Sequence, residues 1–195
     1  MIKKIYILLI TVIIFGCENE NLSLKTENNN DFVQNEILLP DAIRDLPVEL
    51  DVKNEPDIIK ATENKNDTIK YAWKLQTYVK SLSDEDITIT EFGDYELLND
   101  STWKLHNYSG KPFTSEQFSA WYFKVKNNEF TWENSEDAVI HPNETYVDMG
   151  NWTNKSDTLV YQKGIWYFIG QKPDGSKVMG YSFYENLPEL VNSHD

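Results

Sequence analysis

The chain has 195 residues, and its 32 acidic against 18 basic side chains give a formal net charge of −14. Such a surface repels phosphate backbones and anionic headgroups, so we expect neither nucleic-acid binding nor electrostatic docking on a membrane. The single cysteine excludes internal disulfides and metal sites built from several thiolates. We therefore expect a fold that is stabilised by its hydrophobic core.

The first 17 residues have the three parts of an export signal. Lys3 and Lys4 form the charged start, residues 5–15 are apolar, and the small Gly16 precedes Cys17. The apolar run is too short for a membrane span, which needs about 18 consecutive apolar residues. We therefore predict a signal peptide over residues 1–16.

The run from Ile14 to Cys17 resembles the lipobox of bacterial lipoprotein precursors. The resemblance implies cleavage before Cys17, thioether lipidation of its sulfur, and acylation of the new amino terminus with a chain such as palmitate. Several acyl chains anchor a protein stably, so the expected partner is a lipid bilayer. The expected location is the bacterial envelope, on the periplasmic or cell-surface face of the outer membrane. A protein that is simply secreted, or whose leader is not cleaved, is the alternative.

Two segments precede the expected domain. Residues 17–35, which begin at the lipidated cysteine, are rich in Asn, Glu and Ser and predict a disordered tether. Glu18 and Glu20 resemble signals that send lipoproteins to the cell surface in some Gram-negative lineages, and a plain acidic linker is the alternative. Residues 36–66 contain three prolines, which exclude a long helix. We interpret them as an arm that lies along the domain.

Residues 67–195 predict a single α+β domain that begins with an amphipathic helix over 67–83. Asp67 is placed to cap this helix. The apolar side chains recur at spacings of three and four and would share one face: Tyr71, Ala72, Leu75, Tyr78, Val79 and Leu82. That face needs a packing partner.

Residues 86–186 predict mainly antiparallel strands. Short β-branched and aromatic runs are separated by polar residues or glycine, at 87–89, 103–105, 130–132, 145–147 and 158–161. One short helix interrupts them, because Thr114 and Gln117 form a capping box that predicts a helix from Ser115 to about Phe123.

A β-hairpin is predicted from Ile165 to Phe183, around the turn Lys172-Pro173-Asp174-Gly175. If Lys172 pairs with Ser176, one face collects core residues: Ile165, Tyr167, Ile169, Met179, Tyr181 and Phe183. The other face places Trp166 opposite Ser182 and Phe168 opposite Gly180. Large rings over small residues suit either a packed helix or a ligand.

Much of the C-terminal part resembles the small lipocalin-like domains of bacterial lipoproteins. The resemblance is carried by Trp103-Lys104-Leu105, by Phe118 to Trp121, by the run from Phe123 to Trp132, and by Gly150-Asn151-Trp152 leading to Asp157-Thr158-Leu159. In that family the first of these strands opens an antiparallel barrel, and the Asp-Thr-Leu run starts a late strand. The resemblance implies a small barrel or curved sheet, with an internal cavity as one outcome and no catalytic residue to transfer.

Catalytic and cofactor motifs are absent from the sequence. His106, His141 and His194 are widely spaced, and no P-loop, dinucleotide fingerprint or Gly-x-Ser-x-Gly run is present. We predict no cofactor and no metal site. A hydrolase remains an alternative, because a carboxylate pair cannot be recognised without distances.

Four aromatic side chains are the candidate ligand-binding residues: Trp132, Trp152, Trp166 and Phe168. Exposed rings bind sugars and protein partners, and a place in the core is the alternative for each. Three hydroxyls follow an aspartate in tripeptides that resemble an O-glycosylation pattern of exported proteins: Thr68, Ser101 and Thr158.

Together these features predict an anchored envelope lipoprotein whose domain is a non-catalytic binding module. Its ligand would be a small apolar molecule or a glycan that contacts aromatic side chains. An interaction protein, such as an inhibitor or assembly factor that binds an envelope protein through its acidic surface, is the alternative.

Overall fold

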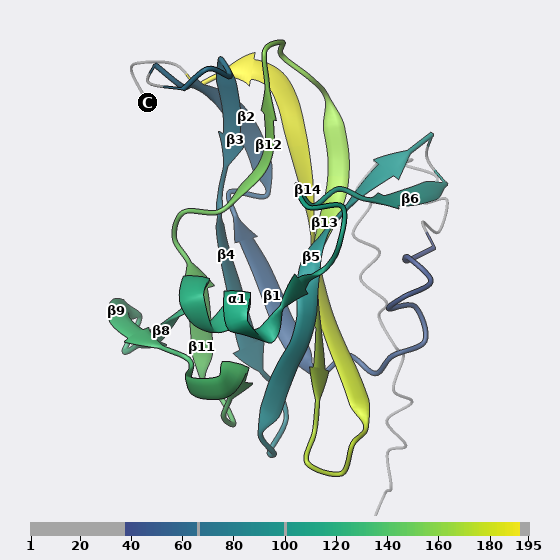
Figure 1. Ribbon diagram of the computed structural model, residues 1–195, viewed down its shortest axis with the longest axis vertical. Coiled ribbons are helices and arrows are strands. Elements are labelled where there is room, and N and C mark those ends of the chain that lie inside the picture. The colour runs from purple at the N-terminus through teal and green to yellow at the C-terminus, as the bar shows by residue number, and fades with distance from the viewer. Residues whose placement is uncertain (1–37, 66, 100, 192–195) are drawn as a thin grey trace, which may run out of the picture. The chain divides into compact units, whose positions relative to one another are not determined.

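The computed structural model describes residues 38–65, 67–99 and 101–191. The predicted signal peptide, the lipidated Cys17 and the tether to residue 35 lie outside the described residues. Within the described part the protein is built mainly from antiparallel strands, with one short α-helix and a sheet that curls into a half-barrel (Figure 1). The expected β-rich fold is thereby confirmed in its coarse form.

Two sheets make up this architecture. The five-stranded sheet has the order β1 (Leu50–Glu55), β4 (Gln76–Ser81), β11 (Thr145–Asp148), β8 (Phe123–Lys126) and β9 (Glu129–Asn134). The larger sheet runs β10 (Val139–Ile140), β5 (Ile87–Leu98), β13 (Gln162–Gln171), β14 (Lys177–Leu190), β2 (Ile58–Glu63), β3 (Tyr71–Lys74) and β12 (Trp152–Ser156). The short strands β6 (Thr102–Leu105) and β7 (Phe113–Thr114) pair with β5.

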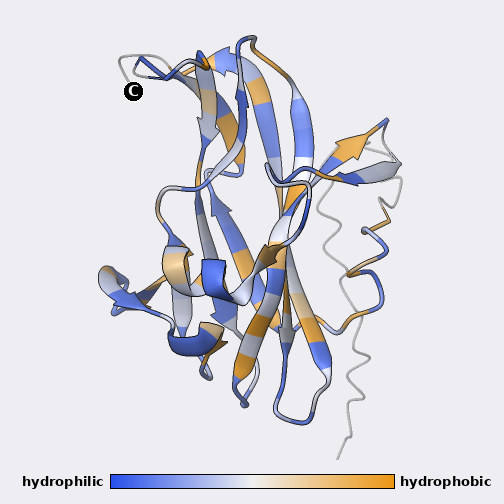
Figure 2. Ribbon diagram, in the orientation of Figure 1, coloured by the Kyte–Doolittle hydropathy of each residue, from blue (hydrophilic) through white to orange (hydrophobic). Residues whose placement is uncertain are grey.

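The hairpin of β13 and β14 has the predicted register. Trp166 pairs with Ser182 and Phe168 with Gly180, and the Lys172 amide donates to the Ser176 carbonyl at 3.0 Å. Residues 164–170 of β13 are all buried, so this strand is covered on both faces. Alternating apolar and polar residues run along its neighbours (Figure 2).

Each face of β13 contributes to a different hydrophobic cluster. On one side Ile165, Tyr167 and Ile169 pack with Met179 and with Ile43 from the segment before β1. The arm predicted at 36–66 therefore covers this face only with its first part. Its later residues form β1 and β2, and β2 lies between β14 and β3 rather than along the domain surface.

The opposite face of β13 belongs to the larger cluster. Here Phe168 stacks on Phe92 of β5, with ring centroids 5.6 Å apart and planes 6° from parallel. Helix α1 (Ser115–Trp121) adds Phe118, which is fully buried and meets Phe168 edge-on at 6.2 Å. The predicted helix is present, and its Gln117 side chain accepts a hydrogen bond from the Thr114 amide at 2.9 Å. A 3₁₀ turn, η1 (Glu136–Ala138), lies beyond β9.

The helix expected over residues 67–83 is wrong, because this segment forms β3 and β4. In β4 the buried positions alternate, as Thr77, Val79 and Ser81, and this is the period of a strand. Two of these inward side chains are polar, so the alternation is hidden in the sequence. Thr77 is tolerated there because its hydroxyl donates to Asn54 at 3.1 Å and accepts from Asn151 at 2.8 Å.

The strand expected at residues 158–161 is also wrong. These residues connect β12 to β13 and lie mostly at the surface. Local polar bonds replace strand pairing at the start of the connection: the Ser156 hydroxyl accepts the Thr158 amide at 3.1 Å, and Asp157 accepts the Lys70 amide at 3.1 Å.

The two sheets meet where the chain entering β1 crosses β14. The Met179 amide donates to the Pro47 carbonyl at 2.8 Å, and the Glu49 amide donates to the Met179 carbonyl at 3.0 Å. At the next residue, a Cβ on Gly180 would collide with the carbonyl oxygen and Cβ of Leu50. Glycine is required here because two backbones approach closely.

We predict that Gly180→Ala lowers the free energy of unfolding by about 1–3 kcal/mol, because the crossing strands must move apart. Chemical denaturation measures this change. Gly150→Ala is the matched control, since the nearest heavy atom to its added Cβ lies 3.8 Å away. Equal stability of the Gly180→Ala variant and the wild type would contradict the assigned crossing.

Candidate functional site

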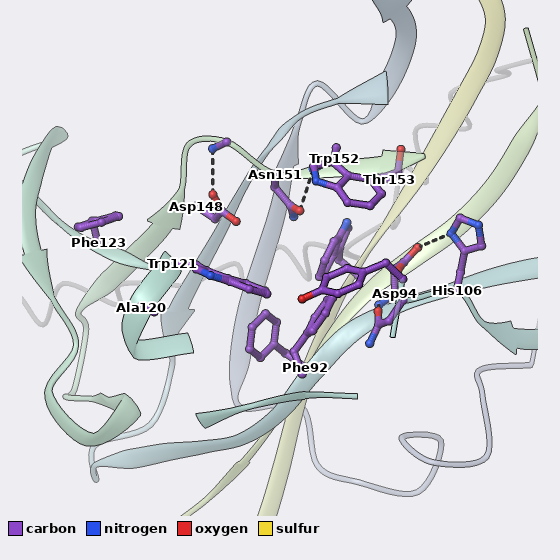
Figure 3. Close-up of a pocket in the computed structure, with 15 residues that line it drawn as sticks. Phe92, Asp94, His106, Ala120, Trp121, Phe123, Asp148, Asn151, Trp152 and Thr153 are labelled. Atoms are coloured by element: carbon purple, nitrogen blue, oxygen red, sulfur yellow. Dashed lines mark hydrogen bonds and ion pairs between the residues drawn. The ribbon is translucent and has the colours of Figure 1, made fainter. Parts of the chain in front are cut away.

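A pocket of about 370 Å³ lies on the face of the larger cluster, beside α1 (Figure 3). Strands β5 and β13 form one wall, and the connection from β11 to β12 forms another. The lining residues are Phe92, Asp94, His106, Asn107, Tyr108, Phe113, Ala120, Trp121, Phe123, Asp148, Gly150, Asn151, Trp152, Thr153 and Trp166. A volume in this range suits a ligand of one or two rings.

Seven aromatic rings, set at different angles, line the pocket. Phe113 meets Trp121 almost perpendicularly, with centroids 5.1 Å apart at 76°, and lies nearly parallel to Trp166 at 6.3 Å and 18°. Tyr108 and Trp152 are stacked, with ring centroids 6.4 Å apart and planes 29° from parallel. The indole N–H of Trp166 is buried and has no acceptor among the described residues. These faces can contact a flat apolar surface of a ligand from more than one side.

A buried carboxylate, Asp94, lies at one end of the pocket. Its Oδ2 accepts a hydrogen bond from the Tyr184 hydroxyl at 2.9 Å and lies 3.2 Å from Nδ1 of His106. The hydrogen bond to Asp94 raises the pKa of His106 above its ordinary value. Asn107 fixes the adjoining loop, because its side-chain oxygen accepts the Asp94 amide at 2.9 Å and its nitrogen donates to the Lys111 carbonyl at 2.8 Å.

A chain of buried side-chain hydrogen bonds continues from Tyr184 toward the other pocket wall. The Gln162 side-chain nitrogen donates to the Tyr184 hydroxyl at 3.4 Å, and the Gln162 oxygen accepts from Asn186 at 3.0 Å. Asn186 in turn accepts from the hydroxyl of Thr153, a pocket residue, at 2.8 Å. Since buried polar groups are stable only when paired, this chain fixes the position of the two walls relative to each other.

A second carboxylate, Asp148, lies at the other end of the pocket, next to Trp121 and Asn151 (Figure 3). It accepts the Gly150 amide at 2.8 Å. Burial raises the pKa of Asp148, and the Gly150 hydrogen bond partly opposes this shift. No ion pair to Asp148 is found among the described residues.

The four sequence-predicted aromatic residues have three different locations. Trp152 and Trp166 line the pocket. Phe168 is fully buried in the larger cluster, under α1, so it has a packing role. Trp132 on β9 is 80% exposed and does not line the pocket, and its ring contacts Phe123 and Phe130.

The three hydroxyls of the O-glycosylation prediction, Thr68, Ser101 and Thr158, are all exposed. Thr68 contacts its neighbour Asp67, with its hydroxyl donating to the carboxylate at 3.3 Å. All three hydroxyls are accessible at the surface, and their O-glycosylation stays a prediction.

Sequence reasoning missed most of the polar groups of the pocket and several of its rings. Asp94 and Asp148 were not distinguishable among 32 acidic residues. Trp121 stood in a predicted helix, where an aromatic residue ordinarily packs in the core. The lipocalin-like resemblance marks several pocket residues, because its runs include Trp121 and Phe123 as well as Asn151 and Trp152.

The described residues contain neither a cluster of metal ligands nor a helix that could span a membrane. No group of three or more His, Cys, Asp and Glu side chains is arranged to hold a metal ion there. Within the same part of the chain, no helix has both the length and the apolar character needed to cross a membrane.

We predict that Asp94→Asn lowers the pKa of His106 toward about 6.5, because the hydrogen bond that raises it is weakened. Titration of the imidazole protons by NMR measures the pKa. In the wild type, the stability contributed by this pair is fully present below about pH 6.5 and is lost as the pH rises through the raised pKa. His141, whose Nδ1 lies 2.7 Å from Asp86, is the control and keeps its pKa. An unchanged His106 pKa would disprove the assigned pairing.

Comparisons with known proteins assign no family. No family model matches the chain, and no curated protein matches it. Among solved structures, the chain is similar to the CooA pilin subunit from enterotoxigenic Escherichia coli, at 13% identity over 71% of this chain and 97% of that chain. The TM-score of 0.26 is too low to establish a shared fold.

Proposed function

We propose that this protein is a lipid-anchored envelope protein that binds a glycan, without catalysis, in the pocket beside α1. The observation that carries the proposal is the composition of the pocket, in which aromatic faces from β7, α1, β12 and β13 are combined with carboxylate, amide and hydroxyl groups. A sugar ring has the complementary chemistry, since its C–H faces stack on aromatic rings and its hydroxyls exchange hydrogen bonds at the edges.

The polar groups favour a glycan over a small apolar ligand. Asp94, Asp148 and Asn151 all lie on the pocket wall. An acyl chain or other apolar ligand would bury them without offering hydrogen bonds, and this opposes binding most at Asp148, whose side chain accepts only the Gly150 amide among the hydrogen bonds of the described residues. Hydroxyls of a sugar can replace the water that these groups lose.

A lipid anchor at Cys17 would place this pocket at the surface of the envelope membrane. The predicted tether of residues 17–35 would separate the domain from the bilayer by up to about 60 Å when fully extended. A lipocalin-like origin of the domain belongs to the same proposal, and the curled sheet with a pocket beside it supports that origin.

We expect Trp152→Ala to weaken glycan binding about tenfold, because one stacking surface of the pocket is removed. Calorimetric titration with oligosaccharides that a glycan array identifies measures the effect. Trp132→Ala is the matched control, since its ring is exposed but does not line the pocket. Loss of binding in Trp132→Ala with full binding in Trp152→Ala would contradict the assigned site.

We expect full-length protein, expressed in a Gram-negative host, to incorporate labelled palmitate and to fractionate with membranes. Cys17→Ser removes the sulfur that would be lipidated, so label and membrane association should both be lost. Equal labelling of the two proteins would disprove the anchor and would leave the glycan proposal intact.

A further inference from the structure

We propose that the glycan bound in this pocket carries a protonated amine, and that Asp148 is the residue that recognises it. This inference rests on the proposed glycan-binding function and names the chemical class of its ligand. It is carried by the charges on the pocket wall, by the bonding of each carboxylate, and by the aromatic faces beside Asp148.

The charged groups that line the pocket are mainly acidic. Asp94 and Asp148 contribute two carboxylates, His106 is the one basic side chain, and no lysine or arginine is among the lining residues. A ligand with a carboxylate, sulfate or phosphate would meet repulsion, because the one basic side chain, His106, is already paired with Asp94. The pocket therefore excludes acidic sugars and favours neutral or cationic ones.

The two carboxylates differ in how fully they are bonded. Asp94 already accepts a hydrogen bond from the Tyr184 hydroxyl and lies beside His106. The imidazole of His106 compensates the charge of Asp94 inside the protein. Within the described residues, the Asp148 carboxylate accepts only one hydrogen bond, from the backbone amide of Gly150. Burial of its charge is unfavourable and raises its pKa. An ammonium group on the ligand would supply the missing positive charge.

Aromatic faces next to Asp148 suit the same group. Trp121 lies beside the carboxylate in Figure 3, and Trp152 follows on the next strand. The electron-rich face of an indole attracts cations, and Trp152 already has the Lys155 ammonium 5.0 Å from its ring centroid. Lys155 itself does not line the pocket, so it leaves Asp148 without a basic neighbour there. A protonated amine would thus be bound by the Asp148 carboxylate and by the Trp121 ring at once.

A neutral hydroxyl is the competing partner for Asp148, and the test must separate it from an amine. Three methyl glycosides share one ring and differ only at carbon 2: the glucosaminide carries an ammonium, the glucoside a hydroxyl, and the N-acetylglucosaminide a neutral acetamide. Binding of each is measured by NMR titration at about pH 6.5, where most of the amine is protonated.

We expect the glucosaminide to bind about tenfold more tightly than the glucoside, because a charge-assisted hydrogen bond replaces a neutral one. Asp148→Asn should abolish this preference by weakening binding of the glucosaminide about tenfold, and the dispersion of the variant's NMR signals shows that it is folded. Asp84→Asn removes the same charge from an exposed position outside the pocket and should keep the preference.

The remaining outcomes of this titration contradict the inference alone or the inference and the proposed function together. Equal binding of the three glycosides, or a preference that survives in Asp148→Asn, overturns this inference and leaves the glycan-binding proposal standing. Loss of the preference in Asp84→Asn assigns it to the general acidity of the surface and overturns the inference as well. If none of the three glycosides binds, the inference and the proposed function both fail.

Discussion

The close crossing of β1 and β14 at Gly180 is the constraint on which the remaining structure depends. Backbone hydrogen bonds from Met179 bring the chain entering β1 onto β14, and the absence of a side chain at residue 180 lets Leu50 approach. This crossing joins the five-stranded sheet to the larger one. The pocket draws on both sheets, because β5 and β13 of the larger sheet supply one wall and the link from β11 of the five-stranded sheet to β12 supplies the other.

Strand β13 divides the interior that this crossing creates. Its odd-numbered residues from 165 to 169 face the cluster covered by Ile43, and its even-numbered residues face the larger cluster. On that second side α1 covers Phe168. Trp166, two residues earlier on the same face, lines the pocket. Helix packing and the pocket therefore occupy neighbouring parts of one strand face, whereas the sequence left a packed helix and a ligand as alternatives.

Local patterns predicted the hairpin and α1 because each has its signal within a few residues. The turn at 172–175 set the pairing of Trp166 with Ser182, and the Thr114–Gln117 pair set the start of the helix. The segment 67–83 was predicted wrongly because its strand period is carried by buried polar residues such as Thr77. That position is explained only by Asn54 and Asn151, which are distant in sequence.

The candidate site was less predictable than the fold for the same reason. Trp152 and Trp166 could be named as candidates from composition and register. Which other residues line the pocket with them depends on tertiary contacts. That Asp148 forms no ion pair among the described residues is known only from the tertiary positions of its neighbours, such as Gly150 and Trp121. In a chain with a net charge of −14, no single acidic residue is conspicuous.

The most direct test of a glycan site in this pocket follows the indole N–H resonances of all six tryptophans during titration with a bound glycan. Assignment by single Trp→Phe variants identifies each signal. The account predicts that the signals of Trp121 and Trp152 shift with a common dissociation constant while that of Trp132 stays fixed. A shift confined to Trp132, or no shift at a glycan concentration that saturates binding, would contradict it.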